Sequence, residues 1–303
     1  MPTPSGPEPP PPSHFRRAAG TLGGRVPATV GYEPSGPVVA AAGAEPRLHR
    51  GLPSATLTLI FSLAGPVVTA ATPGQLGGPD VHRTLVLVGG LHVDPAYVRA
   101  DPDQAGVQLA VHPLAARALL GVPAAELTAL VSDGTDVLGP GAERLRERLS
   151  EAGWEGRFAL LGEHLMARLA AAPCRSTVRP ELAEAWRWLA VRRGRGRVAD
   201  LAAHVALSPR QLHTLFTREV GRGPKTVARL MRFEHVTAQV GDAVRSGRRV
   251  DLSAVAYACG YADHSHLDRE FSSFAGVGPA AWLAEERRNL QAGGHQHGPG
   301  STS

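Results

Sequence analysis

The part of the chain that decides the fold is residues 252–279, with the sequence LSAVAYACGYADHSHLDREFSSFAGVGP. Its second half places Leu267, Phe271 and Phe274 on one face of a helix, because these residues recur at helical spacing. A shorter helical stretch precedes Gly260, which marks a tight turn. Two short helices joined by such a turn form the helix-turn-helix pattern.

The same pattern occurs once more, 54 to 55 residues earlier in the chain. Leu212, Phe216, Gly221 and Pro224 match Leu267, Phe271, Gly276 and Pro279 at an offset of 55, whereas Leu201-Ala202 match Val255-Ala256 at an offset of 54. The extra residue therefore falls in the turn, where an insertion costs least. Ser208-Pro209 adds an N-cap and a proline at the first helical position, which predicts a helix over 209–220.

The region around the two copies is predicted to be all-α. Apolar stripes indicate helices over 181–193 and 198–205, and a longer helix over 225–245 that connects the two copies. We therefore expect one helical domain over residues 179–290 with two helix-turn-helix motifs.

The first half of the chain has a different pattern, typical of an α+β domain. Short runs over 55–63, 83–90 and 105–112 predict strands of a small, mostly antiparallel sheet or barrel. From residue 113 onward the period becomes helical, with predicted helices over 114–122, 124–131, 142–149 and 158–170. The predicted organisation is a disordered Pro-rich arm (1–25), this α+β domain (26–172), a linker (173–178), the helical domain (179–290) and a disordered tail (291–303).

The composition and the distribution of charge limit the classes of function. Of 303 residues, 43% are hydrophobic and only two are cysteines, which excludes an intrinsically disordered chain and a disulfide scaffold. From Arg179 onward there are 18 Lys and Arg against 12 Asp and Glu, whereas residues 1–178 hold 14 against 15. All the excess positive charge lies in the helical domain, which favours an anionic partner and nucleic acid first. No apolar run approaches the length of a membrane span, and no secretory signal is recognisable, so we expect a cytoplasmic protein.

The duplicated motif resembles the DNA-binding domain of the AraC/XylS family of bacterial transcription regulators. The resemblance covers about 110 residues, 180–288, and departs from the family at Tyr261, where phenylalanine is usual. The segment 106–123 is similar, more loosely, to sensor-like domains of some members. The resemblance implies a transcription regulator that binds duplex DNA through two recognition helices in successive major grooves.

Polar side chains on the outer faces of the two predicted recognition helices are the candidates for reading bases. The resemblance places base-edge contacts on Arg210, His213 and Thr214 of the first helix. The outer residues of the second helix are Ser265, Asp268 and Arg269, with Arg269 the foremost candidate. Arginine matches guanine O6 and N7, and threonine reaches a base or the thymine methyl group. Asp268 could accept a hydrogen bond from cytosine N4 or orient Arg269. The candidates for phosphate contact are Arg222, Lys225, Arg229, Arg248 and Arg249.

The sequence contains no recognisable catalytic, cofactor or metal motif. Gly-x-Ser-x-Gly, phosphate-binding, dinucleotide-binding and His-Glu-x-x-His patterns are absent. The dispersed histidines of the first half (His49, His82, His92, His112) lack ligand spacing. His295 and His297 could bind a metal, but they lie in a segment predicted to be a solvated tail, so we expect no metal site and no cofactor. The alternative function is a DNA repair enzyme that transfers an alkyl group to Cys174, which has Arg175 beside it.

The role of the first domain stays open at the level of sequence. It would sense a small-molecule effector, dimerise, or do both, and oligomerisation alone is the third alternative. The partners expected besides double-stranded DNA are therefore an effector, RNA polymerase and a second copy of the chain. Effector, operator and direction of regulation are not encoded in any recognisable motif.

Overall fold

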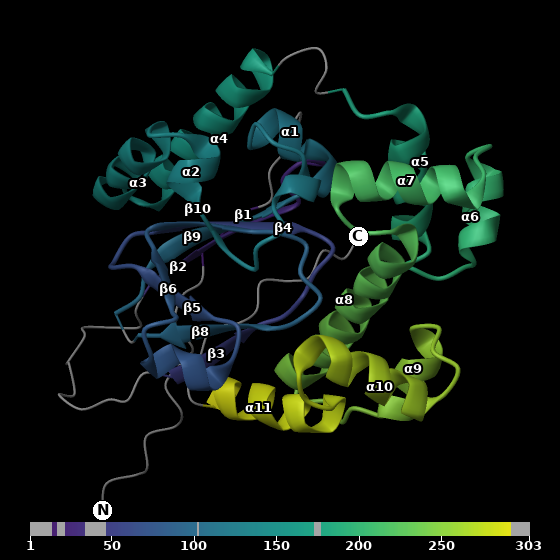
Figure 1. Ribbon diagram of the computed structural model, residues 1–303. Coiled ribbons are helices and arrows are strands. Elements are labelled where there is room, and N and C mark those ends of the chain that lie inside the picture. Colours follow the sequence, from purple (N-terminus) through teal and green to yellow (C-terminus); the bar gives the residue numbers. More distant parts are fainter. Residues whose placement is uncertain (1–13, 17–21, 34–46, 102, 173–176, 292–303) are drawn as a thin grey trace, which may run out of the picture.

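The computed structural model describes residues 14–16, 22–33, 47–101, 103–172 and 177–291 (Figure 1). The predicted arm, linker and tail fall largely outside these residues, and so does Cys174, so the proposed boundaries stay predictions. The described part consists of an antiparallel β region with four helices, followed by seven helices. The predicted fold class, an α+β domain followed by an all-α domain with two helix-turn-helix motifs, is confirmed.

The β region contains two sheets in which all described strand pairs are antiparallel. The six-stranded sheet has the order β1 (His14–Arg16), β2 (Ala28–Tyr32), β9 (Gly106–Val111), β4 (Leu57–Ser62), β7 (Val86–Gly89) and β10 (Ser132–Asp133). The four-stranded sheet has the order β3 (Arg47–Gly51), β8 (Ala96–Ala100), β5 (Val67–Ala70) and β6 (His82–Thr84). The strands predicted over 55–63 and 105–112 correspond to β4 and β9.

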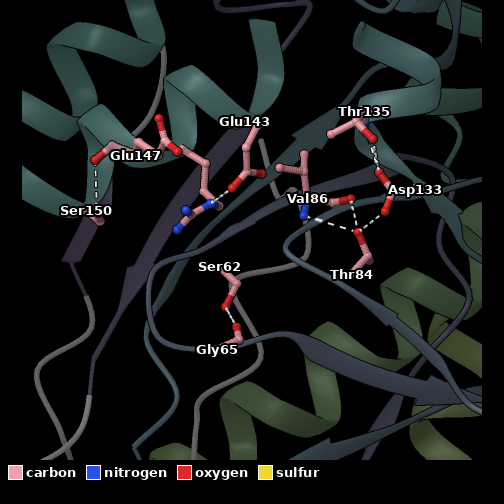
Figure 2. A network of polar contacts seen from close by, with 10 residues as sticks. Ser62, Gly65, Thr84, Val86, Asp133, Thr135, Glu143, Glu147 and Ser150 are labelled. Carbon is pink, nitrogen blue, oxygen red and sulfur yellow. Dashed lines mark hydrogen bonds and ion pairs between the residues drawn. The ribbon is translucent and has the colours of Figure 1, made fainter. Parts of the chain in front are cut away.

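The predicted strand over 83–90 is wrong as a single element. The chain leaves the four-stranded sheet after Thr84 and enters the six-stranded sheet at Val86. Figure 2 shows what holds this crossing: the Thr84 hydroxyl lies 2.7 Å from both the Val86 carbonyl oxygen and Asp133 Oδ2, and the Val86 N–H donates to it at 3.2 Å. Because residues 85–88 form a continuous apolar run directly after Thr84, the sequence pattern does not distinguish one strand from two.

The six-stranded sheet has one face covered by helices and one face that lines a cavity. The helices are α1 (Ala116–Leu119), α2 (Gly134–Leu138), α3 (Gly141–Glu151) and α4 (Trp154–Ala171). Along β4, Leu57, Leu59 and Phe61 are buried in the core that these helices complete, whereas Thr58 and Ile60 point the other way into the cavity. The period of two in this strand therefore separates the core from the cavity wall.

The helix predicted over 124–131 is wrong. Only a 3₁₀ turn, η4 (Ala124–Glu126), forms there. The chain then runs along the sheet, where a Cβ on Gly90 would lie 2.0 Å from the Leu127 carbonyl oxygen. The chain therefore passes close to the end of β7 as non-helical backbone, which the local sequence does not reveal.

Six of the seven C-terminal helices correspond closely to predicted ones, and α11 was not predicted as a separate helix. The seven are α5 (Pro180–Val191), α6 (Val198–His204), α7 (Pro209–Val220), α8 (Pro224–Arg245), α9 (Leu252–Ala258), α10 (His264–Ala275) and α11 (Pro279–Gln291). α8 passes between the group α5–α7 and the group α9–α11 (Figure 1). Among the described residues, no helix is both long and apolar enough to span a bilayer.

The turns of the two motifs confirm where the extra residue lies. In the first turn Ala206 has φ +53° and Ser208 caps α7, whereas in the second Gly260 has φ +79° and Asp263 caps α10. Ala206 and Gly260 are 54 residues apart and the two caps are 55 apart, so the extra residue is Ala262. Ala206 therefore holds a left-handed conformation at the position where the second copy has glycine.

Ala206→Gly is expected to stabilise the protein by a few tenths to about 1 kcal/mol. The left-handed conformation costs a residue with a Cβ about 1–2 kcal/mol, and the greater entropy of glycine in the unfolded chain offsets part of the gain. The matched control is Ala203→Gly within α6, which should cost about 0.5–1 kcal/mol. Urea unfolding of both variants checks the prediction, and a loss of stability in both would show that Ala206 is not strained.

Candidate nucleic-acid interface

The two recognition helices, α7 and α10, bury one face and expose the other. On α7, Leu212 and Phe216 are fully buried, and on α10 so are Leu267 and Phe271. Both helices begin with a side-chain cap: the Ser208 hydroxyl accepts from the Gln211 N–H at 3.2 Å, and Asp263 Oδ1 accepts from the His266 N–H at 2.7 Å. Capping places the first turns of the two helices at well-defined positions on the surface.

All six candidates for base contact are exposed in the structure. Arg210, His213 and Thr214 occupy positions i, i+3 and i+4 of α7 and share one outer stripe. At an offset of 55, Ser265, Asp268 and Arg269 occupy the same stripe on α10. The fold therefore places the two sets at equivalent sites of equivalent helices.

Three of these side chains have defined neighbours. The Thr214 hydroxyl donates to the Arg210 carbonyl oxygen at 3.0 Å. His213 packs over Gly223, where a Cβ would lie 2.8 Å from its ring. Asp268 Oδ1 lies 3.6 Å from His264 Nε2, one turn earlier on α10. The guanidinium groups of Arg210 and Arg269 lie on exposed residues in the first half of each helix.

The five candidates for phosphate contact fall into two groups. Lys225, Arg248 and Arg249 are exposed at the start of α8 and in the loop after it. Arg222 Nε donates instead to the Leu91 carbonyl oxygen at 2.7 Å. Arg229 Nε donates to Glu270 Oε2 at 2.8 Å, and its guanidinium lies 4.7 Å from the centre of the Phe274 ring. The last two arginines are thus half-buried and already bonded within the protein.

Glu270 is a buried carboxylate on the inner face of α10 that the apolar pattern did not single out. Only 6% of the residue is exposed, and it receives hydrogen bonds from Arg229, from Arg232 Nη2 at 3.2 Å and from the Tyr261 hydroxyl at 3.0 Å. Burial, followed by the neighbouring Glu270 carboxylate, raises the pKa of Tyr261 well above its usual range. The network ties the second recognition helix to α8. The sequence did contain a sign of this residue, because Glu270 lies at helical spacing within the apolar stripe of Leu267, Phe271 and Phe274.

The carboxyl end of the first recognition helix is docked on the β region. Arg117 Nε donates to Glu219 Oε2 at 2.9 Å, and Arg222 bonds the loop after β7. Gly221, which ends α7 with φ +78°, lies so close that a Cβ on it would be 3.0 Å from Ala125 Cα. The first domain therefore holds α7 by its last turn and leaves the first turn exposed.

The carboxyl end of the second recognition helix is docked in the same way on the other sheet. Arg50 of β3 donates to the Ala275 carbonyl oxygen at 2.9 Å, to the Tyr97 hydroxyl at 3.0 Å and to Glu285 at 3.3 Å. A Cβ on Gly276 would lie 3.1 Å from the Tyr97 hydroxyl. Gly221 and Gly276 are equivalent in the duplication, so both recognition helices contact the first domain through the same position.

A cavity of about 330 Å³ lies between the two sheets and reaches the connecting helix. Its walls come from both sheets, and α8 and α11 close one side with Glu234, Gly241, Arg245, Trp282 and Glu286. The volume lies at the lower end of the range of small-molecule sites, about 300–1,000 Å³. Because α8 carries one helix-turn-helix motif at each end, a molecule in this cavity would contact the element that joins the two recognition helices.

Glu234 of α8 is a carboxyl group at this cavity whose pKa is clearly raised. Burial raises its pKa to about 7, although the Ala55 N–H, which donates to Oε1 at 2.9 Å, opposes the shift. The other titratable residues lining the cavity are Tyr32, His49, His92, Arg245 and Glu286. Burial lowers the pKa of His92, so this imidazole is neutral near pH 7.

The raised pKa of Glu234 predicts a pH-dependent stability. The folded protein keeps the Glu234 proton to a higher pH than the unfolded chain, so this contribution is complete below about pH 4.5 and is lost as the pH rises to about 7. Glu234→Gln removes the titration. The variant should gain stability over the wild type between pH 5 and pH 8, by at most ~3 kcal/mol.

Urea unfolding at pH 5 and pH 8 checks this expectation. Glu147→Gln, an exposed substitution on α3, serves as the control with the same change of charge. Parallel pH profiles of the wild type and Glu234→Gln would contradict it.

The described part of the chain contains neither a reactive cysteine nor a cluster of metal ligands. Cys259 is buried, and burial raises the pKa of its thiol to about 11. Among the described residues, no three His, Cys, Asp or Glu side chains gather as they would around a metal ion.

Tyr257 of α9 is 86% exposed, and the apolar pattern had not singled it out.

Comparisons with known proteins agree with the position of the duplicated motif. Residues 201–285 match the family model of a helix-turn-helix domain. No curated protein matches the chain.

Three solved structures represent the structural matches. ToxT from Vibrio cholerae O395 has 10% identity and a TM-score of 0.46, over 80% of this chain and 94% of ToxT. ToxT bound to (E)-4-(8-methylnaphthalen-1-yl)but-3-enoic acid has 11% identity and a TM-score of 0.47, over 80% of this chain and 96% of ToxT. A probable AraC family transcriptional regulator from Rhodopseudomonas palustris CGA009 has 21% identity and a TM-score of 0.32, over 36% of this chain and 99% of that protein.

Proposed function

We propose that the chain is a DNA-binding transcription regulator with a helix-turn-helix domain of the AraC type, and that it reads duplex DNA with α7 and α10 in successive major grooves. The observation that carries the proposal is the equivalent exposure of two polar stripes at positions 55 residues apart. A helix enters the major groove with the side chains of its first turns toward the base edges. On both helices, these are the turns that the first domain leaves uncovered.

The proposed base contacts are those of the two stripes. Arg210 and Arg269 would each bond guanine O6 and N7, and Thr214 would reach a base or a thymine methyl group. His213, Ser265 and Asp268 complete the reading surface, and Asp268 would accept from cytosine N4. Lys225, Arg248 and Arg249 would contact phosphates, because they are exposed and basic. For Arg222 and Arg229 we propose a positioning role, since phosphate contact would cost them their partners within the protein.

We propose that the cavity between the two sheets takes a small-molecule effector. Its occupant would touch α8, and the first domain holds the carboxyl ends of both recognition helices. A change in the cavity would therefore alter the relative positions of α7 and α10. Such a change would alter the affinity for DNA, because two helices bind one duplex together only at a fixed spacing.

The remaining partners and the location are proposals of the same kind. RNA polymerase and a second copy of the chain would be contacted by surfaces outside the recognition helices, and the protein would act in the cytoplasm. We also propose that the chain is not an enzyme. The alternative, alkyl transfer to a cysteine, would rest on Cys174, which lies outside the described residues, because Cys259 is buried with a raised pKa.

Selection of bound sequences from random duplex DNA by the full-length protein tests the proposal. We expect one site with two short half-motifs about one helical turn, ~10 base pairs, apart. Binding should weaken steeply with salt, because each neutralised phosphate releases counterions. Binding without any sequence preference would contradict the proposal.

Arg210→Ala and Arg269→Ala should each relax specificity at a different half-motif. Each loss should cost about 1–3 kcal/mol of discrimination at one base pair and leave folding intact, because both side chains are exposed. Titration against a panel of single-base changes in the selected site measures this. The control is Arg218→Ala in the last turn of α7, which should not change base preference. Uniform weakening on all sequences would show that both arginines contact only phosphate.

A further inference from the structure

The chemistry of the cavity limits the kind of molecule that it can take. Most of the wall is apolar or hydroxyl-bearing, with Val30, Ile60, Leu87, Thr58 and Thr69 among the lining residues from the two sheets. The charged lining residues are Glu234, Arg245 and Glu286. Arg245 is already ion-paired with Asp242 of the same helix. Among the described lining residues, Glu234 is thus the carboxyl group from α8 at a site that is otherwise largely apolar.

We propose that the effector is a small, mostly apolar molecule that carries a protonated amine, and that Glu234 is the residue that binds the amine. This inference rests on the proposed function of the cavity and adds the chemical class of its ligand. Ala55 donates one hydrogen bond to Glu234 Oε1, and a carboxylate accepts several more. An ammonium group beside it would form a charge-assisted hydrogen bond, which is about twice as strong as a neutral one.

The alternative ligand classes fit the same wall less well. A carboxylate ligand would face Glu234 in a largely apolar space, where like charges repel strongly because the local dielectric constant is low. A neutral alcohol could donate to Glu234 but would leave its negative charge uncompensated. Burial raises the pKa of Glu234 to about 7, and among the described residues no cation opposes this shift.

The position of Glu234 also indicates how binding would be transmitted. Its bond to Ala55 joins α8 to the segment just before β4, over a separation of 179 residues. An ammonium group bonded to the same carboxylate would hold Glu234 in its charged form and so change the strength of this link between α8 and the first domain. The effect would reach both recognition helices, because α8 connects the two motifs.

Calorimetric titration of the full-length protein with three probes of equal chain length tests the proposal. The probes are hexylamine, 1-hexanol and hexanoate at pH 7.5. We expect hexylamine to bind about tenfold or more tighter than hexanoate. Glu234→Gln should remove most of this preference and leave 1-hexanol binding nearly unchanged. Glu147→Gln, with the same change of charge on an exposed part of α3, should retain the preference.

Several results would overturn the proposal. Hexanoate binding as tightly as hexylamine, an unchanged amine preference in Glu234→Gln, or no binding of any probe would each exclude Glu234 as an amine site. Selection of bound DNA with the same protein preparation distinguishes failure of the proposed ligand class from failure of the proposed function. A selected site together with failed amine binding would overturn the ligand class alone, whereas loss of sequence-specific DNA binding would overturn the proposed function.

Discussion

Phe271→Ala is expected to lower the free energy of unfolding by about 3–5 kcal/mol, because it empties a large, fully enclosed site. Phe271 has no exposed surface, and its ring centre lies 5.0 Å from that of Phe233 and 5.5 Å from that of Trp282. These three rings join α10 to α8 and α11. Removing one of them leaves a cavity that the surrounding helices can fill only in part. Urea unfolding monitored by circular dichroism measures the loss.

The control for Phe271 is its exposed neighbour on the same helix. Ser272→Ala removes a hydroxyl group at the surface and should change stability by no more than about 0.5 kcal/mol. Equal effects of the two substitutions would show that the inner and outer faces of α10 are assigned incorrectly. All the base-reading proposals on α10 would then fail together.

Glu270→Ala is expected to cost a similar amount, about 3–5 kcal/mol, for an electrostatic reason. Arg229 and Arg232 both donate to this carboxylate, and their side chains are only 32% and 18% exposed. Removing the carboxylate leaves two half-buried cations without their shared partner, and breaking a buried ion pair on one side is strongly destabilising. Unfolding in urea and DNA affinity should both report the loss, because Glu270 holds the second recognition helix on α8.

Glu219→Ala provides the comparison for Glu270. It removes the Arg117 ion pair from the other recognition helix, where both side chains are more exposed. A partly exposed pair of this kind contributes about 1 kcal/mol or less. If the two glutamate substitutions cost the same, burial does not control the strength of the Glu270 network.

The helical domain could be predicted almost completely from the sequence. α7 begins and ends where Ser208-Pro209 and Gly221 predict, since capping and left-handed termination depend on residues within a few positions of each end. The duplication identified the second motif independently and located the extra residue in its turn. The outer stripes followed from the inner ones, because a helix has a fixed period.

One buried carboxylate, Glu270, and one half-buried carboxylate, Glu234, were missed because their partners come from other segments of the chain. Glu270 follows Leu267 on the apolar stripe of α10, and Glu234 follows Leu230 on that of α8. Each stripe contains an acid where an apolar residue is expected, which is the only local sign. The packing of separate segments supplied the partners of each acid. Glu270 is paired with two arginines, whereas Glu234 accepts from the Ala55 N–H beside the cavity.

The sequence by itself determined the local elements whose signals are short-range: the two recognition helices, the cap of the first one, the connecting helix and the strands of the short apolar runs. Only the tertiary structure decided the split between β6 and β7 after Thr84, the non-helical path after Ala124–Glu126 and the cavity wall shared by two sheets and α8. It also decided that Arg222 and Arg229 bond within the protein. The reason is physical: a helix cap or a period is complete within one segment, whereas a cavity or an ion-pair network exists only where separate segments meet.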